Sequence, residues 1–329
     1  MADNIAKRIR EMAKILDAEY IARALKIPVK TVKGVLSGEI PDSALDGFDP
    51  ERPPDVRLVE QKKLIRSKLI GVVSTGGCGA TTLTASLAVL SAKRGDLPVA
   101  AVDLNELSYL GYAFGLDVYG EQSAFFPNVL WWNADKVKNS LVRHPEVDNL
   151  FIALGAATAE RYAELEPDKI GSSIKTLAGA YSTVFVDCPA SPYLWKDVTS
   201  CLDMLIFVVR PDIAHLMSFW QVVPLLREQK AKTVVVINGE NAKGALATAD
   251  CRRIINKATD VDILTSLPED PGLREANNNN VCYAAGRTSP YTEAVDRILD
   301  VLQPQSSVQK KKTIFSGVAG FIKNSFANL

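Results

Sequence analysis

Short apolar runs alternate with stretches of helical character over most of the chain, and this alternation constrains the fold more than any other feature. The runs are KLIGVVS (68–74), PVAAVDL (98–104), NLFIALG (149–155), TVFVDCP (183–189), MLIFVVR (204–210), KTVVVIN (232–238) and DILTSLP (262–268). A strand with one wet face alternates apolar and polar residues, whereas these runs are apolar almost throughout, as in strands buried on both faces. We therefore predict an α/β fold with a doubly wound, mostly parallel sheet.

Changes in composition divide the 329 residues into four segments. Residues 1–40 have a helical period and predict a small all-α domain, and residues 41–67 are rich in proline, acidic residues and glycine, as in a linker. The α/β domain occupies residues 68–303. Residues 304–329 form a basic, amphipathic tail.

The charge balance excludes a protein held on nucleic acid or membrane by its overall field, because 38 Lys and Arg residues face 38 Asp and Glu residues. Any binding to nucleic acid or membrane therefore has to come from local clusters of charge. The N-terminus lacks the apolar core of a signal peptide, and we expect a cytoplasmic protein. The five cysteines are scattered and favour reduced thiols. For Cys78 two readings stay open, a tolerated small residue and a redox switch.

The first forty residues predict three helices, over 5–16, 18–25 and 29–36, with Asp17 as the N-cap of the second. The last two resemble a helix-turn-helix, in which Ile21, Ala22, Leu25, Val32, Val35 and Leu36 pack inward. Lys30, Thr31 and Lys33 then lie on the outward face and are the candidates for DNA contacts.

The first apolar run leads into STGGCGATTLTASLAVLSAK, a glycine-rich turn followed at once by a helix from about residue 81 to 93. Such glycines let successive backbone N–H groups converge on an anion, and the helix N-terminus adds partial positive charge. The candidate phosphate-binding residues are Gly76, Gly77, Gly79, Ala80, Thr81 and Thr82. Thr81 occupies the Ser/Thr place that binds magnesium in a P-loop.

This segment resembles the MinD/ParA family of P-loop ATPases, whose deviant Walker A motif has the form K-G-G-x-G-K-[ST]. The sequence has Thr75 in place of the signature lysine, which in the family reaches the neighbouring subunit's nucleotide. It has Ala80 in place of the lysine that grips the terminal phosphates. Both lysines of the motif are lost.

Two further segments match the family's switch regions. VDLNELS is similar to switch I, with Asp103 kept and Asn105 in place of the carboxylate that orients the attacking water. VDCPA matches the D-x-P-A of switch II through Asp187. The resemblance implies magnesium binding by Thr81, Asp103 and Asp187.

Two later segments resemble those that frame the adenine in these proteins. They contribute Asn238, Pro268 and Asp270 as candidate base-binding residues. Together the matches cover about residues 68–303 in the family's order.

The substitutions predict weak binding of ATP and Mg²⁺. A charge-assisted hydrogen bond contributes about 1.5–3 kcal/mol, so losing one lysine weakens binding by roughly tenfold to more than a hundredfold. Phosphoryl transfer depends on positioned charge, and we expect ATP hydrolysis to be slow or absent. Three readings stay open: a mere tight connection, nucleotide binding without useful turnover, and real turnover with some other lysine, such as Lys68 or Lys93, in place of the missing one. The isolated histidines His144 and His215 receive no catalytic role.

The tail has lysines followed by apolar residues at helical spacing, as in helices that lie on a membrane surface. The candidate membrane-binding residues are Lys311, Lys312, Phe315, Val318, Phe321, Ile322 and Phe326. MinD-like proteins end in such a helix. The alternatives are docking into a partner's groove or onto this protein's own core.

Within the family, the degraded loop looks most like the atypical TadZ/CpaE branch, which places pilus or secretion machinery in the cell. The resemblance implies a homodimer that positions a membrane-associated assembly, peripheral on the inner face of the membrane, with pilus or secretion machinery as partner. The alternatives are a partition or regulatory protein that binds DNA through its N-terminal domain, and an active ATPase.

Overall fold

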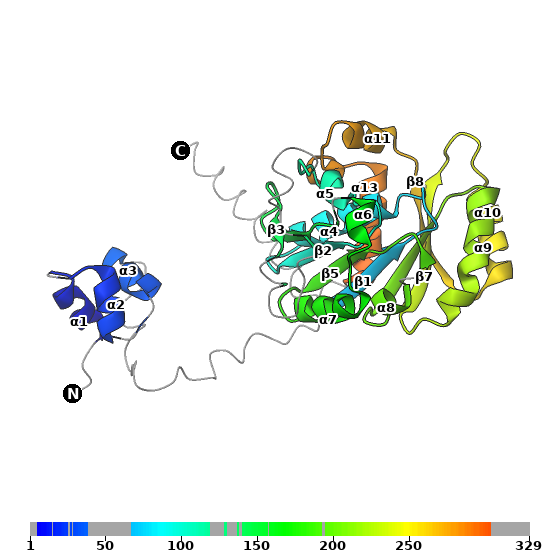
Figure 1. Ribbon diagram of the computed structural model, residues 1–329. Coiled ribbons are helices and arrows are strands. Elements are labelled where there is room, and N and C mark those ends of the chain that lie inside the picture. Colours follow the sequence, from blue (N-terminus) through cyan, green and yellow to red (C-terminus); the bar gives the residue numbers. More distant parts are fainter. Residues whose placement is uncertain are drawn as a thin grey trace, which may run out of the picture. The chain divides into compact units, whose positions relative to one another are not determined.

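The computed structural model describes residues 5–14, 16–25, 27, 29–38, 67–118, 128–129, 137, 140–156, 158–192 and 195–303 (Figure 1). The predicted tail, and the predicted linker apart from Ser67, lie outside these residues. Contacts divide the chain into two units, residues 1–65 and residues 66–329. Each is described by itself.

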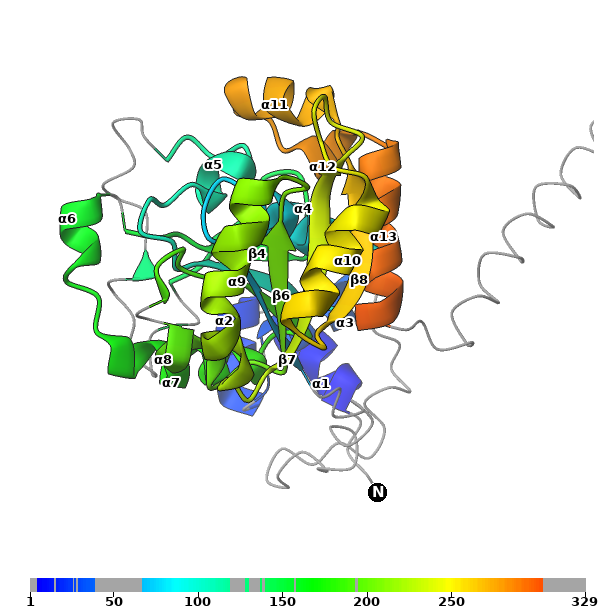
Figure 2. The ribbon, with the colours of Figure 1, turned by 90° about the vertical axis from the view of Figure 1, so that its right-hand side faces the viewer.

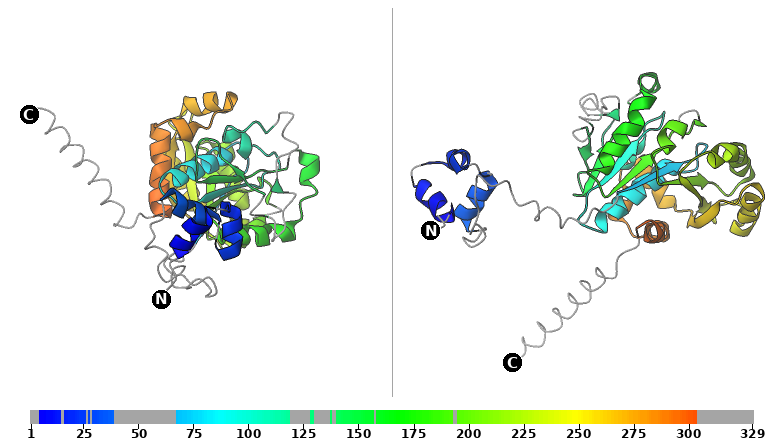
Figure 3. Two further views of the ribbon diagram at one scale, coloured as in Figure 1. Left: turned by 90° about the vertical axis from the view of Figure 1, so that its left-hand side faces the viewer. Right: turned by 90° about the horizontal axis from the view of Figure 1, so that it is seen from below.

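The smaller unit has three helices, drawn in blue in Figure 3: α1 (Ile5–Met12), α2 (Ala18–Leu25) and α3 (Val29–Ser37). Asp17 caps α2, because its Oδ1 accepts hydrogen bonds from the backbone N–H groups of Glu19 at 3.0 Å and Tyr20 at 2.8 Å. The predicted cap is therefore present. The first helix ends at Met12 rather than at the predicted residue 16.

Apolar side chains from the three helices form a core of their own. Its buried members include Ile5, Ile9, Ile21, Leu25, Val32 and Val35. The inward placement of Leu36 was wrong, since 43% of this residue is exposed. Leu36 lies about 100° around the helix from Val35 and near the end of α3, so it is at the border of the buried side rather than within it.

The larger unit is built on an eight-stranded sheet with the order β3-β4-β2-β5-β1-β6-β7-β8. Its strands are β1 (Lys68–Val73), β2 (Val99–Asp103), β3 (Val142–Arg143), β4 (Leu150–Ala153), β5 (Thr183–Asp187), β6 (Met204–Val209), β7 (Lys232–Glu240) and β8 (Asp262–Pro268). All pairs are parallel except β3 with β4. The predicted doubly wound, mostly parallel sheet is confirmed, and each apolar run forms a strand.

Helices cover both faces of the sheet (Figure 2). One face packs against α4 (Ala80–Lys93), α5 (Leu110–Ala113), α12 (Tyr283–Gly286) and α13 (Pro290–Leu302). The other packs against α7 (Pro167–Ala178), α8 (Trp195–Thr199), α9 (Ile213–Arg227) and α10 (Thr248–Ala258). The remaining helices are α6 (Ala159–Tyr162) and α11 (Pro271–Asn278).

Strand β1 shows why the apolar runs are continuous. Ile70 and Val72 belong to the core on the α4 side, whereas Leu69 and Val73 belong to the core on the α9 side. Successive side chains of a strand point to opposite faces, so a sheet with two covered faces requires apolar residues at every position.

The sheet also determines where a ligand can bind. β1 lies between β5 and β6, and the chain leaves β1 to reach β2 on the far side of β5. In open α/β sheets, ligands bind at the carboxyl ends of the strands where the winding direction changes. The segments after β1, β2, β5 and β6 meet there.

Candidate phosphate and magnesium site

The phosphate loop, residues 74–79, joins β1 to α4 and has the backbone conformation that only glycine adopts easily. The φ angles of Gly76, Gly77 and Gly79 are 101°, 67° and 87°, all in the left-handed region. Gly79 is the N-cap of α4 and provides no side-chain cap. The first N–H groups of a 14-residue helix therefore lie at the loop, which is the arrangement that binds phosphate elsewhere.

Ala80 opens α4, and it is buried, with 7% of its surface exposed. A methyl group thus occupies the position at which the motif has a lysine, and Thr75, at the signature position, is also uncharged. The loop keeps its backbone geometry without the side-chain cations of the motif. Thr81 and Thr82 follow in the first turn of α4.

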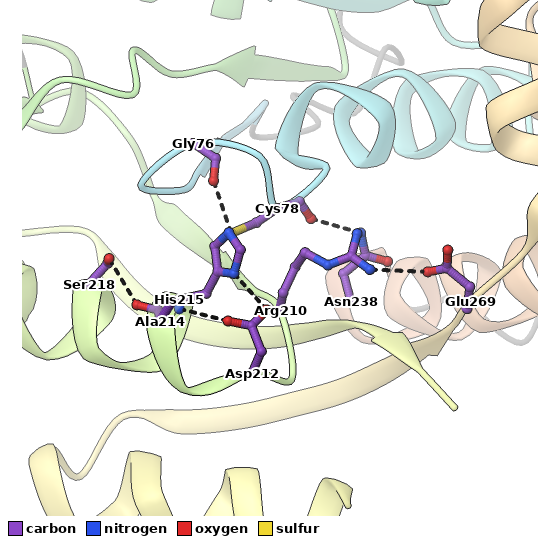
Figure 4. Close-up of polar contacts among 9 residues, drawn as sticks. All are labelled: Gly76, Cys78, Arg210, Asp212, Ala214, His215, Ser218, Asn238 and Glu269. Atoms are coloured by element: carbon purple, nitrogen blue, oxygen red, sulfur yellow. Dashed lines mark hydrogen bonds and ion pairs between the residues drawn. The ribbon is translucent and has the colours of Figure 1, made fainter. Parts of the chain in front are cut away.

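Asn238, at the carboxyl side of β7, braces the loop. Its Nδ2 donates a hydrogen bond of 2.8 Å to the Cys78 carbonyl (Figure 4). A Cβ on Gly79 would lie 2.5 Å from the same nitrogen, so this position requires glycine. This bond uses one of the two Nδ2 hydrogens, which leaves the second hydrogen and the Oδ1 of Asn238 for the predicted contact with a base.

The other predicted base-binding residues lie beyond β8. Pro268 ends that strand, and Asp270 is the N-cap of α11, where its Oδ1 accepts from the Gly272 N–H at 3.0 Å. The Asp270 Oδ2 accepts a hydrogen bond from the Tyr283 hydroxyl. Both carboxylate oxygens of Asp270 therefore already have protein partners.

The magnesium-side cluster consists of Thr81, Asp103 and Asp187. The Thr81 hydroxyl donates to Asp187 Oδ2 at 2.7 Å. Strand register places Asp103 directly opposite Asp187, and both residues are completely buried. The Asp187 Oδ1 is buried without a hydrogen-bond partner among the described residues. An orphaned carboxylate oxygen beside a hydroxyl is a hard oxygen donor set, which fits Mg²⁺.

Burial raises the pKa of both carboxyl groups. The pKa of Asp103 is raised by desolvation, although hydrogen bonds from Ser108, Asn105 and Leu110 oppose the rise. The pKa of Asp187 is raised well above its usual range, first by desolvation and then by the neighbouring Asp103 carboxylate. Two buried carboxylates side by side favour a shared proton or a bound cation.

Asp103 is held by its own loop. Its Oδ1 accepts from the Asn105 N–H at 3.0 Å, and its Oδ2 accepts from the Ser108 hydroxyl at 2.8 Å and the Leu110 N–H at 3.0 Å. Of the three predicted magnesium ligands, Thr81 and Asp187 therefore have the donor atoms with fewer hydrogen-bond partners. Asp103 is better placed to orient the ion's water shell.

Glu106 is a charged residue of the site that the motif comparison missed. Its carboxylate accepts hydrogen bonds of 3.1 Å from the N–H groups of both Ala190 and Ser191, in the segment after β5. Glu106 thereby links the segment after β2, which resembles switch I, to the segment after β5, which resembles switch II. Asn105, its neighbour, accepts a 3.4 Å hydrogen bond from Leu107. The only signal in the sequence was the carboxylate of Glu106, one position after residue 105, where the motif has a carboxylate.

His215 is the second missed residue. It lies in the first turn of α9, and its Nε2 is 3.7 Å from the place that a Cβ on Gly77 would take. Asp212 caps the same helix and accepts from the His215 Nδ1 at 2.7 Å (Figure 4). The signal was the position of D-x-x-H directly after a strand whose carboxyl end faces the loop.

Cys78 is buried beneath the loop, with 1% exposed, and its Sγ donates to the Gly76 carbonyl at 3.3 Å. Burial raises its pKa to about 11. Since the thiolate is the reactive form, this environment supports the reading of Cys78 as a tolerated small residue over that of a redox switch.

The lysines proposed as replacements do not reach the loop, so that prediction was wrong. Lys68 is the first residue of β1, so it lies at the end of the strand away from the loop. Its Nζ donates to the Leu302 carbonyl. Lys93 ends α4 and donates to the Ala285 carbonyl. A rise of 1.5 Å per residue places the end of α4 roughly 20 Å from its start.

The remaining candidates belong to the smaller unit and to the tail. In the smaller unit, Lys30 and Lys33 are exposed and Thr31 is half-buried. Residues 311–326, with all the candidate membrane contacts, lie outside the described residues. Among the helices that the structure describes, none combines the length and apolar character needed to cross a bilayer.

Comparisons with known proteins agree with this geometry. No protein-family model matches the chain. An uncharacterized ATP-binding protein of Methanocaldococcus jannaschii is 25% identical over 261 residues, which are 76% of this chain and 93% of that protein. The chain also superposes on MinD of Pyrococcus horikoshii complexed with Mg-ADP, with a TM-score of 0.61, 23% identity, and coverage of 72% of this chain and 96% of MinD.

A ParA family ATPase of Chlorobium tepidum is similar as well, with a TM-score of 0.61, 19% identity, and coverage of 72% of this chain and 98% of the ATPase. The order of the motifs, the strand order and these superpositions agree. The larger unit of this chain has the fold of the MinD and ParA ATPases.

Proposed function

We propose that this chain is a MinD/ParA-type protein that binds ATP with Mg²⁺ weakly, without useful hydrolysis, and uses the bound state to position an assembly in the cell. The observation that carries the proposal is the Thr81–Asp187 pair beside the left-handed glycine loop. The loop offers backbone donors to a phosphate, and the pair offers oxygen donors to the metal.

The metal contributes charge between the carboxylates and the phosphates when it is bound. Thr81 and Asp187 would hold it, because the Asp187 Oδ1 is buried and unpartnered. Asp103, which is hydrogen-bonded within its own loop, would orient the water molecules around the metal. Backbone N–H groups at Gly76, Gly77 and Gly79 would bind the phosphates, with Gly76 exchanging its present hydrogen bond to the Ser74 Oγ, and the Asn238 side-chain amide would contact the base.

Hydrolysis is slow in this proposal because three charged groups are missing. Ala80 and Thr75 carry no charge toward the transferred phosphoryl group, and Asn105 cannot accept a proton from water as a carboxylate does. Binding needs fewer of these groups than catalysis does. We therefore expect nucleotide occupancy to act as a signal.

The positioning role rests on the relatives. The MinD of Pyrococcus horikoshii is described as a septum site-determining protein, and the similar archaeal protein as ATP-binding. Within this group, the degraded loop favours a TadZ/CpaE-like protein acting as a homodimer with pilus or secretion machinery. The proposed tail, residues 304–329, holds it at the inner face of the membrane.

The experiment compares the purified protein with and without MgATP by sedimentation velocity, and measures phosphate release in the same samples. We expect MgATP to shift the protein from monomer to dimer while phosphate release stays at background. Release well above background that Asp187→Ala removes would contradict the non-hydrolysing role. An unchanged sedimentation coefficient would contradict the nucleotide-controlled dimer.

A second candidate function is binding of DNA through the smaller unit. The observation that favours it is the exposure of Lys30 and Lys33 on α3, one face of which is buried. Phosphate contacts depend on salt, so binding should be strongest at low ionic strength. A gel shift at about 50 mM salt tests this, with Lys30→Ala and Lys33→Ala combined as the variant. Absence of a shift at low salt would exclude the candidate.

A further inference from the structure

The phosphate loop has a histidine against it that the motif does not contain. The His215 Nε2 lies 3.7 Å from the Cβ position of Gly77, so the edge of the imidazole ring faces the loop backbone. The side chain is 30% exposed and is therefore open to an arriving ligand. Figure 4 shows the ring between the loop and the start of α9.

Asp212 fixes the orientation of this ring. The His215 Nδ1 lies 2.7 Å from Asp212 Oδ2, and the His215 N–H donates to Asp212 Oδ1 at 3.0 Å. A carboxylate can only accept, so Nδ1 carries the proton in this pair. Nε2 is then a bare acceptor in neutral imidazole and an N–H donor in imidazolium. A phosphate oxygen is repelled by the first and bound by the second.

The other charged and titratable groups around the ring are Cys78, Arg210 and Asp212, and the positive charge of Arg210 also acts on Cys78 in the loop. Cys78, on the loop itself, is kept neutral because burial raises its pKa to about 11. Arg210, at the end of β6, directs its Nη2 toward Glu269 at 3.5 Å and packs against Gly239. Asp212 is the carboxylate in direct contact with His215.

We propose that protonated His215 replaces the lost loop lysine, its Nε2–H binding a nucleotide phosphate held at Gly76 and Gly77 while Asp212 holds the ring. This inference rests on the proposed nucleotide binding. Binding of the phosphate then stabilises the imidazolium, so the protein takes up a proton when it binds nucleotide. Nucleotide affinity therefore depends on the imidazolium form and falls where rising pH removes its proton.

The test is a titration with MgATP at several pH values from 6.0 to 8.5, on the full chain and on its His215→Gln variant. A hydrogen bond to a charged group corresponds to about tenfold or more in affinity. We expect the full chain to bind about tenfold more tightly than the variant at pH 6.0, with the two affinities converging by pH 8.5. His144→Gln, in the chain's other histidine, is the control, and its ratio to the full chain should not depend on pH.

Two other groups can also change protonation, namely the terminal phosphate of ATP and the Asp103–Asp187 pair, whose pKa values are raised by burial. Both are the same in the variant, so the ratio of the two affinities isolates His215. Calorimetry in two buffers of different ionisation enthalpy measures proton uptake directly. We expect more proton uptake in the full chain than in the His215→Gln variant.

His215→Lys sharpens the test because it supplies a permanent cation. This variant should keep its MgATP affinity at pH 8.5, where the affinity of the full chain has fallen to that of His215→Gln. Equal affinities of the full chain and His215→Gln at every pH, with equal proton uptake, would overturn the role of His215 and leave nucleotide binding intact. No binding of MgATP by the full chain at any pH would overturn both.

Discussion

The magnesium-side cluster and the phosphate loop lie next to each other at the head of α4, yet they have changed to different degrees. The cluster keeps its hydroxyl and both carboxylates, Thr81, Asp103 and Asp187, in contact or in register. The loop has the left-handed glycines but no charged side chain at positions 75 and 80. The loop geometry depends on the φ angles of its glycines and on the start of α4. It therefore does not require a lysine at position 75 or 80.

If the proposed nucleotide binding holds, we expect the metal side to carry more of it than in a complete P-loop. The buried carboxylate pair costs free energy in the absence of a cation, because burial and mutual repulsion both raise the pKa of Asp187. A chain that had only kept a tight turn would have no physical need for this pair. Substitutions on each side can test the contrast.

The largest effect is expected on the loop side, from Ala80→Lys. A lysine there restores the cation that meets the terminal phosphates, and we expect ATP affinity to rise by roughly tenfold to a hundredfold. Ala80→Met is the matched control, with similar length and no charge. Equal affinities of the two variants, measured by calorimetric titration, would show that the loop does not hold phosphate.

On the metal side, Asp187→Asn should stabilise the protein in the absence of metal. The raised pKa of Asp187 means that its contribution to stability is present at low pH and is lost as the pH rises through the folded-state value. Asp187→Asn cannot ionise at this position and does not lose this stability. Its stability relative to the unaltered chain should therefore increase with pH. A gain of 1 kcal/mol corresponds to about 2–4 °C in melting temperature.

Thermal melts with EDTA at several pH values from 5 to 8 measure this effect. Added Mg²⁺ should raise the melting temperature of the unaltered chain and leave that of Asp187→Asn almost unchanged. A variant that melts lower than the unaltered chain at pH 8 would contradict the account of the buried pair.

A smaller effect is expected for Glu106→Ala, at the link between the two switch segments. The change leaves the N–H groups of Ala190 and Ser191 without their charged acceptor, which costs about 1 kcal/mol or more. Glu275→Ala, an exposed glutamate on α11, is the control. Urea unfolding compares the two, and equal midpoints would mean that the link contributes nothing to stability.

The smallest expected effect is the reactivity of the thiols. Burial raises the pKa values of Cys78, Cys201 and Cys282 to about 11, so roughly 0.1% of each is thiolate at pH 8. We expect alkylation by iodoacetamide to be much slower in the native protein than in guanidinium. Rapid modification of Cys78 in the native protein, located by peptide mapping, would instead favour the redox reading.

The sequence was sufficient for the sheet because burial on both faces requires continuous apolar runs, and each run became a strand. The two-residue β3 was not predicted, since Val142 and Arg143 are too short a segment to show a pattern. The glycine loop was also recognisable, because its left-handed residues have to be glycine.

The missed residues depend on which strands are neighbours. His215 faces Gly77 because β6 pairs with β1, and Glu106 meets Ser191 because β2 pairs with β5. The residues of each segment do not by themselves indicate which strands are neighbours in the sheet. Lys68 and Lys93 were misplaced for the converse reason: closeness to the loop in sequence did not indicate that each lies at the far end of its element.

The central claim is that MgATP binds through the loop backbone together with the magnesium-side cluster. The most direct test is an equilibrium titration of the purified chain with ATP, with Mg²⁺ and with EDTA, repeated on Asp187→Ala and on Asp197→Ala, an exposed aspartate, as the control. The account predicts saturable binding that requires Mg²⁺, is lost in Asp187→Ala and is retained in Asp197→Ala. Absence of saturation up to millimolar ATP, or equal binding by both variants, would contradict it.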